Sequence, residues 1–108
     1  MNWINLTDAQ QLLAIAEKSY VIPQLLFKHS TRCSISSVVK SRLDAADNTT
    51  IDCYYLDLLQ HRNISNQIAT DYKVEHESPQ IIVIKNGDCI YDESQSAIRW
   101  DDVLEALN

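Results

Sequence analysis

The apolar residues of this 108-residue chain switch repeatedly between helical and strand spacing, and this alternation constrains the fold more than any other feature. Thr7 and Gln10 resemble a capping box ahead of leucines and alanines at helical spacing, which predicts a helix over residues 8–19. Further helices are predicted over residues 34–46, 62–72 and 100–107. Runs of β-branched and aromatic residues predict strands over residues 3–5, 24–29, 51–58, 80–85 and 88–92.

The order of these elements predicts a mixed sheet. Strands that alternate with helices favour right-handed crossovers and parallel pairing. Asn86-Gly87 is a strong hairpin signal that adds an antiparallel pair, and Asp47-Asn48-Thr49 is predicted to form a turn. We therefore predict an α/β fold of thioredoxin-like type, with three layers (α/β/α), a central mixed sheet and a C-terminal hairpin plus helix. A chain of 12.4 kDa has room for one such domain, expected to span residues 1–108.

The composition argues against several classes of function. A single glycine, Gly87, argues against glycine-rich phosphate loops and dinucleotide-binding motifs. The longest aliphatic run, Ile81 to Ile84, is too short to cross a membrane, and the opening residues lack the pattern of a secretory signal, so we expect a cytoplasmic protein. A net charge of -6 disfavours binding to nucleic acid. The cysteines and histidines lack the spacing of metal ligands, so no metal site is expected.

Basic residues gather in one interval of this acidic chain. No Asp or Glu lies between Glu17 and Asp44, and residues 18–43 carry five of the nine basic side chains. These five are Lys18, Lys28, Arg32, Lys40 and Arg42. The cluster is either chance on a solvated surface or a local positive field that attracts anions.

Cys33 lies where a predicted strand gives way to a predicted helix. Its sulfur would face unpaired backbone N–H groups and the positive end of the helix dipole, with Arg32 as a neighbouring cation. Such surroundings make a thiol easier to ionise, and an easily ionised thiol also leaves a mixed disulfide faster. Cys53 and Cys89 fall within predicted strands and are expected to be buried. Cys33 is therefore the predicted nucleophile.

Ser36 stands three residues after Cys33, where a dithiol oxidoreductase has its second cysteine. Cys33 therefore cannot close a disulfide within its own motif. It must be reduced by another molecule's thiol or by a remote thiol of this chain, Cys53 or Cys89. Ser36 is expected either to bind the Cys33 thiolate or to be an ordinary first-turn serine.

Ser78-Pro79 precedes the predicted strand over residues 80–85. Thioredoxin-like folds place a cis-proline at this position, facing the active cysteine. It would expose the backbone of Ser78 to a bound disulfide partner.

Two segments together resemble the monothiol bacilliredoxins, the redox proteins of the bacillithiol system. They are FKHSTRCSIS (residues 27–36) and HESPQ (residues 76–80), and the resemblance extends over essentially the whole chain. It implies a thioredoxin-like monothiol thiol-disulfide oxidoreductase that removes bacillithiol from S-thiolated cytosolic proteins. Bacillithiol would be the low-molecular-weight thiol co-substrate, with no bound cofactor. Ser34 departs from the family, which usually has proline there.

The resemblance also assigns roles to residues. Cys33 would accept the thiol, and Pro79 would be the cis-proline. Supporting and substrate-binding roles fall to residues close to these two in sequence. They are Thr31, Arg32, Ser34 and Ser36 on the cysteine side, Ser78 beside Pro79, and Lys28, which with Arg32 could attract the carboxylates of bacillithiol.

Two other readings remain open at this point. A monothiol glutaredoxin-like protein would handle glutathione or an iron–sulfur cluster, and a non-catalytic thioredoxin-like adaptor would merely retain Cys33. The three histidines, His29, His61 and His76, form no triad or ligand pattern and are assigned no catalysis, while Trp3 and Trp100 are expected to be packing residues.

Overall fold

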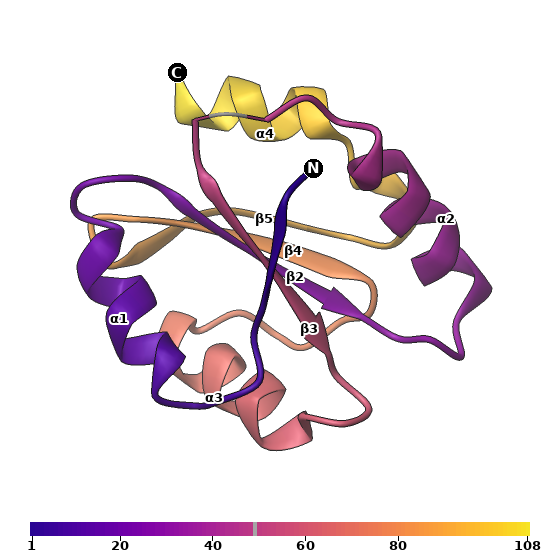
Figure 1. The fold of residues 1–108 in the computed structure, drawn as a ribbon, viewed down its shortest axis with the longest axis horizontal. Helices are drawn as coiled ribbons and strands as arrows, with labels where there is room; N and C mark the ends of the chain where they lie inside the picture. The colour runs from indigo at the N-terminus through magenta and orange to yellow at the C-terminus, as the bar shows by residue number, and fades with distance from the viewer. Residues whose placement is uncertain (49) are drawn as a thin grey trace.

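The computed structural model describes residues 1–48 and 50–108 and contains a five-stranded sheet of order β1-β3-β2-β4-β5 (Figure 1). β1, β3 and β2 are parallel to one another, and β4 runs antiparallel to both of its neighbours, β2 and β5. The strands are β1 (Trp3–Asn5), β2 (Gln24–His29), β3 (Asp52–Asp57), β4 (Gln80–Lys85) and β5 (Asp88–Ser94). The mixed sheet and its C-terminal hairpin are as predicted.

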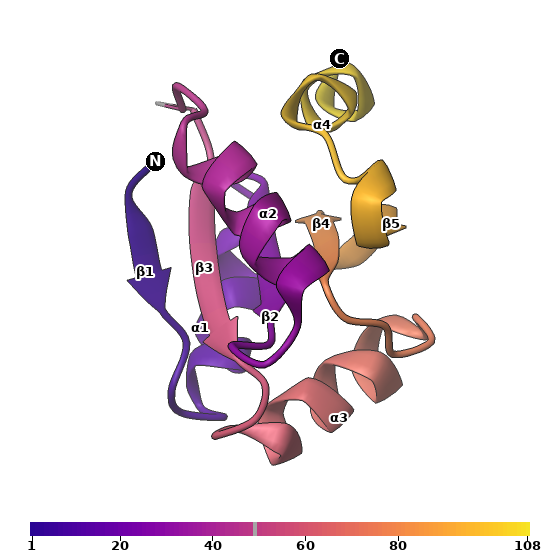
Figure 2. The same ribbon diagram turned by 90° about the vertical axis from the view of Figure 1, so that its right-hand side faces the viewer.

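Helices cover both faces of the sheet, which confirms the three-layer prediction (Figure 2). One face packs against α1 (Gln11–Lys18) and α3 (Arg62–Tyr72), and the other against α2 (Ser34–Asp44) and α4 (Trp100–Leu107). A short 3-10 helix, η1 (Gln95–Ala97), joins β5 to α4. Alternate residues of each strand supply the two cores because successive side chains point to opposite faces. Trp3 and Trp100 pack against the core under α2 and α4, as predicted.

The predicted capping box at the start of the first helix is wrong. The helix begins at Gln11 instead of residue 8, and Gln10, at its N-cap, makes no side-chain capping bond. Oε1 of Gln11 accepts hydrogen bonds from the backbone N–H groups of Thr7 (2.8 Å) and Asp8 (2.9 Å). The glutamine one position later thus performs the capping, and residues 8–10 form a turn before the helix.

Smaller differences affect other boundaries. α2 ends at Asp44 instead of residue 46, and β3 spans Asp52–Asp57 instead of 51–58. β5 continues to Ser94 because it pairs with the whole length of β4, as far as Gln80. The predicted turn over residues 47–49 includes Thr49, which lies outside the described residues.

The two ends of the sheet differ in what they bring together. At one end, His29 at the end of β2 pairs with Asp57 at the end of β3, and Lys28 pairs with Gln80 at the start of β4. The loop to α2 and the segment before β4 therefore meet at this edge. At the other end lies the Asn86-Gly87 hairpin, whose φ angles of 54° and 80° confirm the predicted turn chemistry. Across residues 1–48 and 50–108, no helix has both the length and the apolar character needed to span a membrane.

Candidate active site

Cys33 is the N-cap residue of α2, where the chain changes from an extended to a helical backbone. Its N–H donates to the Ser30 carbonyl (3.2 Å), and its carbonyl accepts from the Ser37 N–H (3.1 Å), so its backbone is held on both sides. The side chain is half-buried, and its sulfur has no hydrogen-bond partner within the described chain. The first turn of α2 contains no acidic residue. The sulfur therefore lies at the positive end of the α2 dipole, with no negative side chain in the first turn of the helix.

Ser36 does not serve as a partner of Cys33. It is fully buried, and its Oγ accepts from the Ser30 N–H (3.1 Å) and lies 2.7 Å from Nδ1 of His29. The predicted bond to the Cys33 thiolate is therefore wrong, because the hydroxyl points inward and ties the loop to β2. The alternative, a first-turn serine that satisfies backbone groups, is confirmed by its bond to the Ser30 N–H. Burial lowers the pKa of His29, and the nearby Lys40 charge lowers it further, so the ring is neutral near pH 7. The hydroxyl of Ser36, at the position of a second cysteine, thus holds the loop before α2 against β2.

Lys28 also differs from its prediction. Its side chain is fully buried, and Nζ donates to the carbonyl of Ser65 in α3 (3.1 Å) and lies 3.3 Å from Nδ1 of His76. Burial lowers its pKa to about 8. Within the described residues the ammonium has no carboxylate partner, which is unusual for a buried lysine. Lys28 therefore cannot contact a ligand directly. It links β2 to α3 and to the segment before β4 instead.

The Ser78–Pro79 peptide bond is cis, as predicted, and Pro79 is buried at the start of β4. Gln95 of η1 holds this segment, because its Nε2 donates to the Ser78 carbonyl (2.8 Å) and its N–H donates to the Pro79 carbonyl (2.9 Å). The Ser78 N–H has no hydrogen-bond partner within residues 1–48 and 50–108. Sequence analysis missed Gln95, since no motif surrounds it.

The basic interval largely disperses in three dimensions. Lys18 pairs with Asp52 (2.8 Å) and Lys40 with Asp44 (2.9 Å), while Lys28 is buried. Besides the buried Lys28, Arg32 and Arg42 are the cations of this interval without an ion pair in the described structure. Arg32 is exposed beside Cys33, together with the exposed side chains of Thr31 and Ser34. The local positive field near the thiol therefore comes from Arg32.

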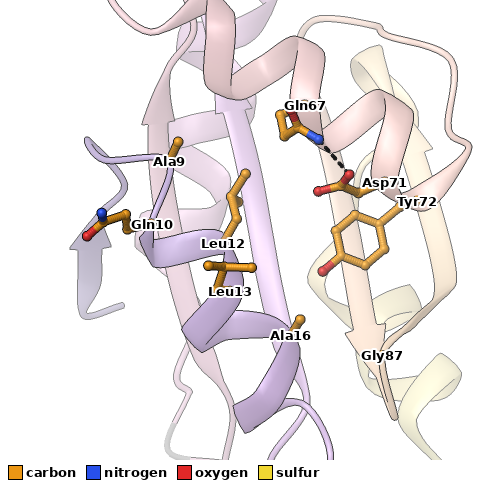
Figure 3. A pocket seen from close by; sticks show the side chains of 9 residues that line it. All are labelled: Ala9, Gln10, Leu12, Leu13, Ala16, Gln67, Asp71, Tyr72 and Gly87. Carbon is orange, nitrogen blue, oxygen red and sulfur yellow. Dashed lines mark hydrogen bonds between the residues drawn. The ribbon is translucent and has the colours of Figure 1, made fainter.

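A recess between α1 and α3 is remote from this chemistry. It has a volume of about 620 Å³, with Leu12, Leu13 and Tyr72 in its walls (Figure 3). Its one carboxylate, Asp71, accepts a hydrogen bond from Gln67. Cys33 belongs to the loop before α2, on the opposite face. This recess therefore contributes nothing to thiol chemistry.

The family model described as monothiol bacilliredoxin BrxC matches residues 4–103. The chain belongs to the monothiol bacilliredoxin family. A solved structure described as an oxidoreductase candidate with a thioredoxin fold shares 27% identity, with a TM-score of 0.82 over 97% of this chain and 93% of the other. The thioredoxins of Fasciola hepatica (12% identity, TM-score 0.75, 95% and 94% coverage) and Trypanosoma brucei brucei (13%, 0.72, 98% and 88%) share the fold. The family and the fold together support a thiol redox role.

This member of the family keeps its other cysteines away from Cys33. Cys53 pairs with Leu25 and Cys89 with Ile84, near the hairpin end of the sheet. Leu25 precedes the end of β2 by four residues, or about 13 Å along an extended strand. Burial raises the pKa of Cys53 to about 12 and also raises that of Cys89. Neither thiol is placed to resolve a disulfide at Cys33.

Proposed function

We propose that this protein removes bacillithiol from S-thiolated proteins through Cys33. One observation carries the proposal: an accessible thiol at the start of α2 is combined with a buried serine hydroxyl at the position of a second cysteine. A site of this kind accepts a thiol and passes it on, but does not close a disulfide within its motif. Membership of the bacilliredoxin family supports bacillithiol as the thiol.

The proposed cycle has two thiol–disulfide exchanges. The Cys33 thiolate attacks the bacillithiol sulfur of the target's mixed disulfide, the bond to the target sulfur breaks, and the target leaves as a thiolate that takes a proton from water. A free bacillithiol thiolate then attacks the carried bacillithiol sulfur. This step forms bacillithiol disulfide, breaks the bond to Cys33 and returns its thiolate for the next cycle.

The surrounding residues have distinct parts in this cycle. Ser36 and His29 hold the loop that presents Cys33. The Ser78 N–H, which has no partner in the described residues, would bind the backbone of the target, and Arg32 would supply positive charge at the surface. Ser34 retains a backbone N–H that the usual proline of the family lacks, and this adds one donor near the sulfur.

The proposal is tested with one target protein loaded with bacillithiol or with glutathione in parallel. The wild-type protein should release the target thiol faster from the bacillithiol form, with free bacillithiol closing the cycle. Cys33→Ser should abolish release, while a Cys53→Ala, Cys89→Ala double variant should retain it. Faster release from the glutathione form would favour a glutaredoxin-like function. No release from either form would favour an adaptor.

A further inference from the structure

An apolar groove begins beside Cys33 and follows the outer side of α2. It has a volume of about 170 Å³ and lies between side chains of α2 and Ser96 of η1. Its walls are formed by Ser34, Ile35, Val38, Val39, Arg42 and Ser96. Ile35 and Val38 are 44% and 59% exposed, which is unusual for aliphatic side chains so close to a reactive thiol.

Arg42 marks the far end of this groove. Its Nη1 donates to the carbonyls of Ser96 (3.1 Å) and Ile98 (2.7 Å), which fixes the guanidinium between α2 and the segment before α4. These partners are neutral, so the positive charge is not cancelled. A second recess of about 310 Å³ continues from Arg42 and is also lined by Arg99, Trp100 and Asp101. Neither arginine forms an ion pair with the described carboxylates.

The groove has a defined length. Nine residues of helix separate Cys33 from Arg42, which corresponds to about 13 Å at the rise of an α-helix. An extended chain covers that distance in about four residues. A polypeptide with its cysteine at Cys33 would therefore place its fourth neighbour near Arg42 and Arg99, and its intervening side chains over Ile35 and Val38.

We infer that this groove docks an extended segment of the target protein that carries an acidic side chain about four residues from its thiolated cysteine. The inference rests on the proposed function and names the class of target that it serves. Charge complementarity selects the acidic residue, because two arginines outweigh the single aspartate in the second recess. The carried thiol itself is bonded at Cys33, at the opposite end of the groove.

The test measures binding separately from catalysis. Ten-residue peptides contain one serine in place of the cysteine, with Glu, Gln or Lys four residues away on either side. They are titrated by NMR into the Cys33→Ser protein. The Glu peptide on one side should bind about fivefold more tightly than its Gln counterpart, and the Lys peptide more weakly than both. The Val38 methyl signals should shift, and 0.5 M salt should reduce the preference.

Variants assign the preference to the arginines. Arg99→Gln, in which no described hydrogen bond is lost, should reduce the preference to about twofold. Lys85→Gln removes an exposed cation at the hairpin end of the sheet and should leave the preference at its original value. Equal affinities for Glu and Gln peptides would overturn the inference, as would an equal effect of the two variants.

Peptides of the same sequences with the cysteine restored and bonded to bacillithiol, incubated with the wild-type protein, separate this inference from the proposed function. If the Glu preference in binding persists but no peptide loses its thiol, the docking groove stands and the proposed function fails. If all peptides lose bacillithiol at one rate and bind equally, the function stands and the groove is wrong. If Arg99→Gln slows only the attack by free bacillithiol, equally for every peptide, the arginines hold the small thiol and the inference is overturned.

Discussion

The two ends of the sheet place the same residue type in opposite environments. At the end where β2 and β3 finish, Cys33 sits on the first turn of a helix, half-exposed and without a hydrogen bond from a described residue to its sulfur. Toward the hairpin end, Cys53 and Cys89 lie within strands, and burial raises the pKa of both thiols. The accessible cysteine lies at a helix N-terminus and the two less reactive ones lie within strands, so the place of a cysteine in the fold decides whether it can exchange disulfides.

At the end of the sheet that holds Cys33, the buried polar groups differ between the face under α2 and the face under α3. Under α2, a neutral imidazole and a hydroxyl, His29 and Ser36, bind each other. Under α3, the Lys28 ammonium meets the ring of His76 without a described carboxylate nearby. One side is fully satisfied, and the other retains a charge in the interior, which is costly. The His29–Ser36 bond therefore stabilises the site, whereas the buried charge of Lys28 destabilises the fold beneath it.

The largest expected contrast concerns thiol reactivity. Iodoacetamide should modify Cys33 in the folded protein at least about a hundredfold faster than Cys53, since Cys33 is accessible whereas Cys53 is buried and burial raises its pKa. Peptide mapping after timed quenching measures both rates, and the contrast should vanish in 6 M guanidinium. Comparable modification rates of Cys33 and Cys53 in the folded protein would contradict the claim that only Cys33 is reactive.

Replacing Lys28 should expose the cost of the buried charge. Its folded pKa of about 8 lies below the ordinary 10.5, so the unfolded chain binds more protons between these values and stability rises with pH across that window. Lys28→Met should increase the free energy of unfolding at pH 7 by up to roughly 3 kcal/mol, and the gain should shrink toward pH 10.5.

Urea unfolding of both proteins from pH 7 to 10.5 measures this difference. Comparing the two cancels the opposing titrations of Cys53 and the tyrosines, whose pKa values burial raises. An unchanged or lower stability at pH 7 in the methionine variant would show that the bond to Ser65 outweighs the buried charge.

Removing the Ser36 hydroxyl should have a smaller effect. Ser36→Ala leaves the Ser30 N–H and the His29 ring without their partner, which costs about 1–3 kcal/mol of stability. It should also slow thiol release, because the loop that presents Cys33 is less well held. Ser37→Ala, on the exposed side of the same turn, serves as the matched control. Equal effects on stability would remove the anchoring role of Ser36.

The smallest contrast concerns acid stability. Burial lowers the pKa of His29 and of His76, and adjacent lysines lower both further. The unfolded chain therefore takes up protons near pH 6.5 that the folded protein resists, so stability is full above pH 6.5 and falls below it. The thermal midpoint should fall less between pH 7 and 5 in His29→Gln and His76→Gln than in the wild type. An identical fall in all three would contradict these shifts.

Much of this architecture follows from local pattern, whereas the interior of the site does not. Periodicity predicts the order of strands and helices, and Cys33 and Pro79 stand out by their place in that order. The buried role of Lys28 does not follow from the sequence because every residue of β2 is buried, so polarity there does not mark the surface. Its partners also lie far along the chain, since Ser65 and His76 are 37 and 48 residues beyond Lys28. The inward direction of the Ser36 hydroxyl depends on how the loop before α2 folds back toward His29.

The central claim is that one thiol, Cys33, receives and passes on the carried group without help from the others. The direct measurement exposes the fully reduced protein to bacillithiol disulfide and locates the products by intact and peptide mass spectrometry. The account predicts one bacillithiol adduct, on Cys33, which free bacillithiol removes completely. An adduct on Cys53 or Cys89, or a loss of two hydrogens that marks an internal disulfide, would contradict it.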